Sequence, residues 1–179
     1  MTVPATDSAI EVAYWLIQRA EKDGVFLEDD KLHHLLFAAQ VAYAQKYDRA
    51  VLMPSLFVVD DKGFSEPNLL KMFALGRPYM PPVKLEEKVS AFLENIWKKY
   101  APMTMTAMST LIKASTAYKQ SYKVGEKHVV EVNSILDLFK TASAAPTGNR
   151  KKMLISQNGP VMVSQWMPRK IDALPRKGV

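Results

Sequence analysis

The stretch Lys31-Leu32-His33-His34-Leu35-Leu36-Phe37-Ala38-Ala39-Gln40 decides the fold of this 179-residue chain. Its leucines and Ala39, continued by Tyr43, recur at intervals of three and four residues, which is the spacing of one helix face. Phe37 and Val41 add a second apolar flank. Acidic residues 28–30 come just before it, where the helix dipole favours negative charge. A helix with so wide an apolar surface is typical of a protein core, so we predict a central helix here.

The segments around this helix predict a mainly α fold. Ser8 and Glu11 form a capping box that opens a helix, and Gly24 suits its end. Further helices are predicted from Ser65-Glu66-Pro67 to Phe73, over Leu85–Tyr100, from a cap at Thr104 or Thr106 to about Tyr118, and at the apolar face of Val132, Ile135, Leu136 and Phe139. Apolar runs at Val51–Met53 and Leu56–Val59, followed by turn residues 60–63, predict a small β element. Three prolines in Gly76–Val83 predict a loop. We therefore expect a compact helical bundle with a small β element.

The net charge of +6 is carried by the C-terminal end of the chain. Residues 141–179 contain seven Lys and Arg and one Asp, whereas residues 1–140 are neutral. We therefore predict a body of residues 1–140, followed by a basic linker and extension of residues 141–179. In this extension, Met153–Ile155 and Val161–Val163 can pair as a hairpin across Asn158-Gly159. A neutral body argues against a domain built as a nucleic-acid-binding surface.

The residue types that catalysis and metal binding need are absent or scattered. The chain has no Cys, which excludes thiolate nucleophiles and Cys-based zinc sites, and it has no phosphate-binding loop or nucleophile elbow. His33 and His34 could pair with Asp29 or Asp30 as metal ligands, but adjacent helical residues point about 100° apart. The third histidine, His128, is distant in sequence. We expect a half-buried His pair, no metal, no cofactor, no catalytic residue and no enzyme activity.

The sequence favours a cytoplasmic protein. The N-terminus lacks a basic segment followed by an apolar core, and so resembles no secretory signal. No uncharged apolar run approaches the roughly 18 residues that a membrane span needs. We expect no membrane partner.

Residues 31–40 resemble the signature Lys-Leu-x-Lys-Leu-Leu-Tyr-Tyr-Ala-Gln of the SocA-type antitoxins of the Panacea-domain family. Val12-Ala13-Tyr14-Trp15-Leu16-Ile17 is similar to the first helix of that family, and the resemblance spans residues 8–140. It departs at His34, which replaces a Lys, and at Gly63-Phe64-Ser65-Glu66-Pro67, which stands where the family has Gly-Pro-Val. The residues that carry the signature are expected to be mainly structural: Lys31, Leu32, Leu35, Leu36, Phe37 and Gln40.

The resemblance implies a bacterial antitoxin that binds and neutralises a toxin encoded beside it. A member of the family also acts as an adaptor that delivers its toxin to a AAA+ protease. Because residues 63–73 depart most from the family and the tail lies outside it, we predict partner contacts from these two segments. The candidate residues are Phe64, Ser65, Glu66, Asn68, Lys71, Arg150, Lys151, Lys152 and Trp166. The alternative is a nucleic-acid-binding regulator that acts through the basic tail, where bases lie near Trp166.

Overall fold

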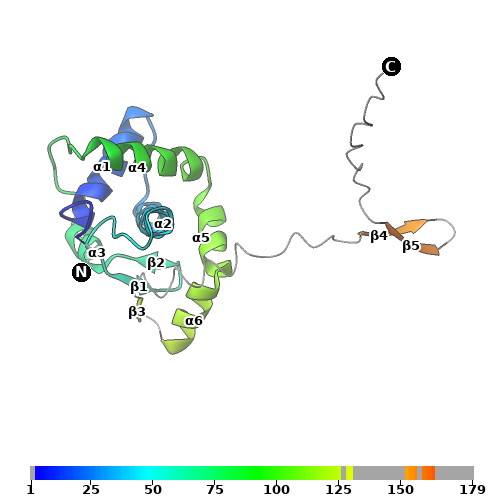
Figure 1. Cartoon of the computed structure of the whole chain (residues 1–179). Coiled ribbons are helices and arrows are strands. Elements are labelled where there is room, and N and C mark those ends of the chain that lie inside the picture. Colours follow the sequence, from blue (N-terminus) through cyan, green and yellow to red (C-terminus); the bar gives the residue numbers. More distant parts are fainter. Residues whose placement is uncertain (1–2, 126–127, 131–151, 157–158, 164–179) are drawn as a thin grey trace, which may run out of the picture. The chain divides into compact units, whose positions relative to one another are not determined.

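The computed structural model describes residues 3–125, 128–130, 152–156 and 159–163. The chain divides into two units, residues 1–144 and 145–179. Within the described residues, the first unit holds six helices and a three-stranded sheet, and the second holds one strand pair (Figure 1). The body is mainly helical with a small β element, which confirms the predicted fold class. No helix in the described ranges is both long and apolar enough to cross a bilayer.

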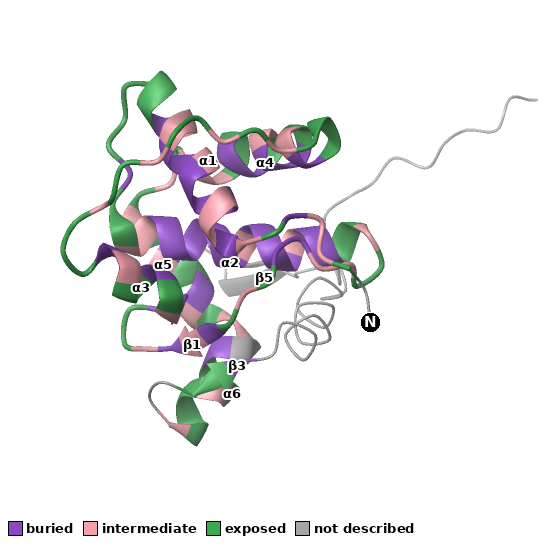
Figure 2. Ribbon diagram, turned by 90° about the vertical axis from the view of Figure 1, so that its left-hand side faces the viewer, coloured by how far each residue is buried: buried purple, intermediate pink, exposed green. Residues whose placement is uncertain are grey.

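Helix α2 (Asp29–Lys46) forms the centre of the body, as its sequence predicts. Eleven of its 18 residues are buried, so the helix is covered on most of its circumference (Figure 2). The elements that contact it are α1 (Ala9–Lys22), α4 (Glu87–Tyr100), α5 (Met105–Ala114) and β2 (Phe64–Ser65). Figure 1 shows α2 end-on, with these elements arranged around it.

Helices α1 and α4 are joined by polar contacts near the C-terminal end of α1. The Arg19 guanidinium donates to both carboxylate oxygens of Glu94, at 2.8 and 3.0 Å, and lowers the pKa of that carboxyl. The Trp97 indole donates to Asp23 at 2.8 Å. Each contact joins a residue at the C-terminal end of α1 to a residue of α4. Together they therefore fix how the two helices lie against each other.

The start of α1 follows the predicted cap with one change. The Ser8 hydroxyl accepts the N–H of Glu11 at 3.2 Å, as a capping box requires. The Glu11 carboxylate, however, accepts the N–H of Asp7 instead of that of Ser8. The cap is therefore spread over one more residue than the pattern predicts.

The β element is an antiparallel sheet of order β2-β1-β3. β1 (Phe57–Val59) pairs with β2 across the turn 60–63, and β3 (Val129–Val130) pairs with the other edge of β1. The Asp60 carboxylate holds the turn by accepting the N–H groups of Lys62 and Gly63, each at 2.8 Å.

The prediction that Val51–Met53 belongs to the β element is wrong. The Met53 N–H donates to the Gln40 side chain at 3.1 Å, and the Val51 and Leu52 carbonyls accept from Ala5 and Thr6 at 2.9 Å. Because these backbone groups already have partners from α2 and from the N-terminal segment, the run stays outside the sheet.

Helix α3 (Pro67–Phe73) begins as predicted, with the Glu66 carboxylate accepting the Leu69 N–H at 2.7 Å. Thr104 caps α5, but the predicted single helix to about Tyr118 is wrong, since α5 ends at Ala114 and α6 (Thr116–Val124) follows. Ser115 separates the two helices. Its backbone is extended and its hydroxyl accepts the Tyr118 N–H at 3.2 Å, which makes it the cap of a new helix.

The second unit contains the strands β4 (Lys152–Ser156) and β5 (Gly159–Val163), which pair antiparallel in the register Met153↔Met162. The strands include the two runs predicted to pair, but Gly159 lies opposite Ser156 as the first residue of β5 and so is not in the turn where the sequence placed it. The predicted helical face at Val132, Ile135, Leu136 and Phe139 lies outside the described residues.

Candidate functional site

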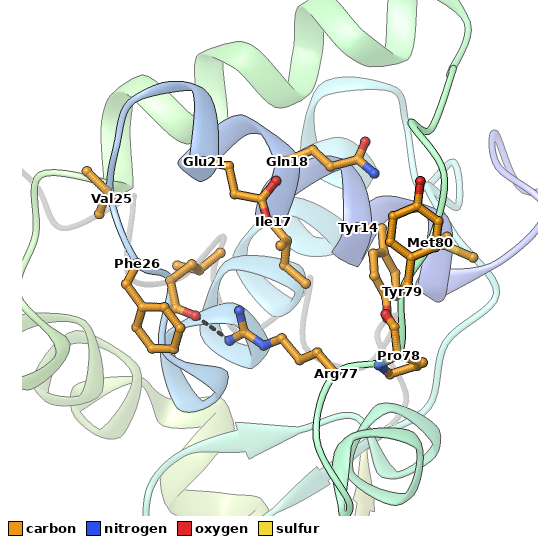
Figure 3. Close-up of a pocket in the computed structure, with 11 residues that line it drawn as sticks. Tyr14, Ile17, Gln18, Glu21, Val25, Phe26, Arg77, Pro78, Tyr79 and Met80 are labelled. Atoms are coloured by element: carbon orange, nitrogen blue, oxygen red, sulfur yellow. Dashed lines mark hydrogen bonds between the residues drawn. The ribbon is translucent and has the colours of Figure 1, made fainter.

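A cleft opens between the C-terminal half of α1, the turn that follows it, and the loop Gly76–Val83 (Figure 3). Its volume is about 450 Å³, which lies within the usual range of ligand pockets. Residues about 60 positions apart in the sequence meet there. The lining residues are Tyr14, Ile17, Gln18, Glu21, Val25, Phe26, Leu27, Arg77, Pro78, Tyr79 and Met80.

The loop Gly76–Val83 is held against α1 by side chains of that helix. Gln18 binds the loop at two points, because its amide donates to the Pro81 carbonyl at 3.1 Å and accepts the Val83 N–H at 2.9 Å. The Tyr14 hydroxyl donates to the Pro78 carbonyl at 2.5 Å, and burial raises the pKa of this phenol. With three prolines and these three bonds, the loop forms a fixed wall of the cleft.

Arg77 lies at the base of the cleft and ties the loop to the start of α2 (Figure 3). Its Nε donates to Asp29 at 2.8 Å, and its Nη2 donates to Asp29 and to the Leu27 carbonyl. The guanidinium also lies over the rings of Phe26 and Phe73, with its carbon 5.2 and 5.8 Å from their centroids. Arg77 is therefore oriented by a carboxylate, a carbonyl and two rings.

The rim of the cleft is apolar and exposed. The Phe26 and Tyr79 side chains are 81% and 91% exposed, while Ile17 and Leu27 beneath them are buried. Large apolar side chains that surround a hollow and face water are typical of surfaces that bind a partner. This combination makes the cleft the candidate functional site.

The residues of the helix signature are buried or bind backbone groups of neighbouring segments. Leu32, Leu35, Leu36 and Phe37 are buried in the core. Lys31 donates to the Ala101 carbonyl at the end of α4, at 2.7 Å. Gln40, also buried, accepts the Met53 N–H. The two polar members thus bind backbone groups of neighbouring segments.

Three of the predicted partner contacts are wrong. Phe64, Ser65 and Glu66 are buried, so none of them forms part of the surface. The Phe64 ring stacks on Phe37 in the core, Ser65 donates to Asp60, and Glu66 caps α3.

The other predicted contacts have different outcomes. Asn68 and Lys71 are exposed on α3 and stay candidates for contact. Arg150, Lys151 and Trp166 lie outside the described residues, and Lys152 is the first residue of β4.

His33 and His34 are fully buried, at 1% exposure each, and not half-buried as expected. His33 Nδ1 accepts the Glu66 N–H at 3.2 Å, and the His34 ring lies against Gly63. His33 Nε2 and His34 Nδ1 have no hydrogen-bond partner among the described residues. Within the described ranges, no group of three His, Asp or Glu residues is placed to hold a metal ion.

The stability of the protein should fall as the pH drops below about 6.5, the usual pKa of histidine. Burial lowers the pKa of His33 and His34, and the acids Asp29, Asp30, Asp60 and Glu66 only partly oppose this shift. The unfolded chain therefore binds protons at a higher pH than the folded chain does. The free energy of unfolding is therefore greatest above the pKa of histidine in the unfolded chain. Below that pKa, each of the two histidines reduces the free energy of unfolding by up to about 1.4 kcal/mol per pH unit.

Urea unfolding at pH 8 to 5 would measure this effect. His33→Gln and His34→Gln should each reduce the slope between pH 6.5 and 5. A wild-type stability that is constant over this interval would contradict the prediction.

No model of a protein family, no curated protein and no solved structure matches this chain.

The sequence did not point to the cleft. Arg77 and Tyr79 stand in a segment for which the sequence predicts a loop and no function. Phe26 comes just after the end of a predicted helix. The available signal was local: two aromatic residues beside Gly and Pro, in segments with no apolar periodicity that would bury them. That the two segments meet over α1 depends on contacts distant in sequence.

Proposed function

We propose that this chain is an antitoxin-like protein-binding module, which neutralises a partner toxin by covering the toxin's working surface. The observation that carries the proposal is the exposed aromatic rim of Phe26 and Tyr79 above the apolar base of the cleft. The resemblance of residues 31–40 to the antitoxin signature supplies the partner class. It also leads us to propose delivery of the bound toxin to a AAA+ protease, and action in the bacterial cytoplasm.

The chemistry of the cleft favours binding over catalysis. The Tyr14 hydroxyl donates a hydrogen bond to the Pro78 carbonyl, and the Arg77 guanidinium is paired with the Asp29 carboxylate. Both groups thus hold the walls of the cleft together. A catalytic site instead needs a nucleophile or acid whose base partner lies within hydrogen-bond reach of the reacting atom.

The test is co-expression of the full chain with the reading frame beside its gene in a bacterial host. If that frame encodes the toxin, its expression alone stops growth, and the wild-type chain restores it. Phe26→Ser combined with Tyr79→Ser should lower rescue at least tenfold, because two exposed aromatic anchors of a contact surface are lost. The fold should persist, since both side chains face water.

Val124→Ser is the matched control, because Val124 is 70% exposed at the end of α6 and outside the cleft. It should rescue growth as the wild type does. A neighbouring product that is harmless alone, or whose toxicity the wild-type chain does not relieve, would overturn the proposal.

The concentration of charge in residues 141–179 favours one alternative, a nucleic-acid-binding regulator. Affinity for single-stranded DNA or RNA would then fall steeply with salt, because each phosphate contact releases a counterion. Replacing Arg150, Lys151 and Lys152 together by Gln would abolish this binding. Wild-type binding that is absent at 50 mM salt would exclude this alternative.

A further inference from the structure

The Arg77 guanidinium at the base of the cleft has one nitrogen, Nη1, that is not used in its contacts with the residues that the structure describes. The bonds of Arg77 to Asp29 and Leu27 come from Nε and Nη2. Among the described residues, Nη1 donates no hydrogen bond. The guanidinium lies between Phe26 and Ile17 (Figure 3). The two N–H groups of Nη1 are therefore placed to meet a ligand that enters the cleft.

The loop wall also offers backbone groups to a ligand. The Pro78 and Pro81 carbonyls and the Val83 N–H are used by Tyr14 and Gln18. In the described part of the chain, the N–H groups of Tyr79 and Met80 donate to no acceptor. An extended peptide chain can pair with backbone groups of this kind, as when a strand adds to an exposed edge.

We propose that the cleft binds an extended segment of the partner protein in which a large apolar side chain, aromatic or aliphatic, is followed or preceded by an acidic residue. The apolar side chain lies over Ile17 between Phe26 and Tyr79, and the carboxylate accepts from Arg77 Nη1. This assignment rests on the proposed function, because it names the feature of the toxin that is recognised. The unused Nη1 donors favour a carboxylate over a cationic group, since a hydrogen bond between charged groups is stronger than a neutral one. The Glu21 carboxylate also lines the cleft, but it is exposed on α1, where water and salt screen its charge.

Two substitutions act in opposite directions on this recognition. Arg77→Gln removes the donor and should weaken binding of an acidic segment at least tenfold, as expected for a lost hydrogen bond between charged groups. Asp29→Asn keeps Arg77 but removes the carboxylate that neutralises it. It should therefore strengthen binding of the same segment about threefold or more. A loss of fold cannot mimic an increase in affinity.

The experiment selects a display library of random heptapeptides against the full chain and against the variant with Phe26→Ser and Tyr79→Ser. The wild type should enrich peptides with Trp, Phe or Leu beside Asp or Glu, and the double variant should not. The selected peptide is then synthesised with its acid and with the corresponding amide. The acid should bind wild type at least tenfold more tightly than the amide, and Arg77→Gln should remove that preference.

Three outcomes would overturn the assignment: no enriched motif, a motif without an acid, or equal binding of the peptide to the Phe26 and Tyr79 double variant. Failure of the proposed function is separable from these. If the motif is selected but no neighbouring toxin is neutralised, the cleft binds peptides and the antitoxin role is wrong. If growth is rescued and no motif is selected, the antitoxin role stands and the partner binds elsewhere.

Discussion

Replacing Phe64 by Ala is expected to lower the free energy of unfolding by about 3–5 kcal/mol, the usual loss for a fully buried Phe. The side chain is 0% exposed. Its ring stacks on Phe37 with centroids 4.1 Å apart and meets Tyr118 edge-on at 5.8 Å. Removing it leaves a cavity between β2, α2 and α6 that rigid neighbours fill only in part. Urea unfolding followed by tryptophan fluorescence would measure the change.

Phe26→Ala is the matched control, because it removes the same atoms from an exposed site. It should cost less than about 1 kcal/mol, the value of an exposed contact between a cation and a ring, since Arg77 lies over this ring. Equal losses for the two variants would contradict the burial of Phe64. If the chain neutralises a toxin as proposed, Phe64→Ala should also reduce rescue through loss of folded protein, and rescue should return on cooling or overexpression.

Gly63→Ala is expected to destabilise the protein by about 2–4 kcal/mol, from overpacking and from an unfavourable backbone conformation. A Cβ at this position would lie 2.4 Å from His34 Nε2 and 3.1 Å from His34 Cδ2. The His34 ring is buried and cannot turn away without disturbing the core. Gly63 also has a φ of +151°, which residues with a Cβ rarely adopt. Chemical denaturation of the two proteins would give the difference.

Two controls separate the collision from the backbone strain. Gly76→Ala has a positive φ of +102° but no heavy atom within 4 Å of the new Cβ, so it should cost only the strain, about 1–2 kcal/mol. In a His34→Ala background, Gly63→Ala should lose most of its excess cost, because the ring that it meets is gone. If the two substitutions were additive, the contact between Gly63 and His34 would not be the cause.

Local patterns were sufficient where a residue's environment follows from its neighbours in sequence. The apolar spacing of α2 predicts its burial, and Ser8 and Thr104 are caps that the sequence predicts. Ser115 is also a residue type that favours the cap position, but the apolar residues on both sides of it predicted a continuous helix. In the structure, the Ser115 hydroxyl caps the start of α6, and the helix breaks there although the apolar spacing continues.

Short elements were predicted less well, for a physical reason. β2 has two residues, too few to show an alternation, so the sequence could not tell that Phe64 and Ser65 face the core. The prediction that they contact a partner rests only on their departure from the family that residues 31–40 resemble. In the structure they are core residues, and the preceding Gly63 lies against His34 of the central helix.

The sequence by itself determined the helical class, the position of the central helix and the separation of a neutral body from a basic extension, because periodicity and charge are properties of neighbouring residues. Only the tertiary structure decided that Gly63 lies against His34, that residues 64–66 are buried, and that Phe26, Arg77 and Tyr79 surround one cleft. Each of these is a contact between segments about 30 or more residues apart. No local pattern encodes such a contact, since it depends on how every intervening element packs.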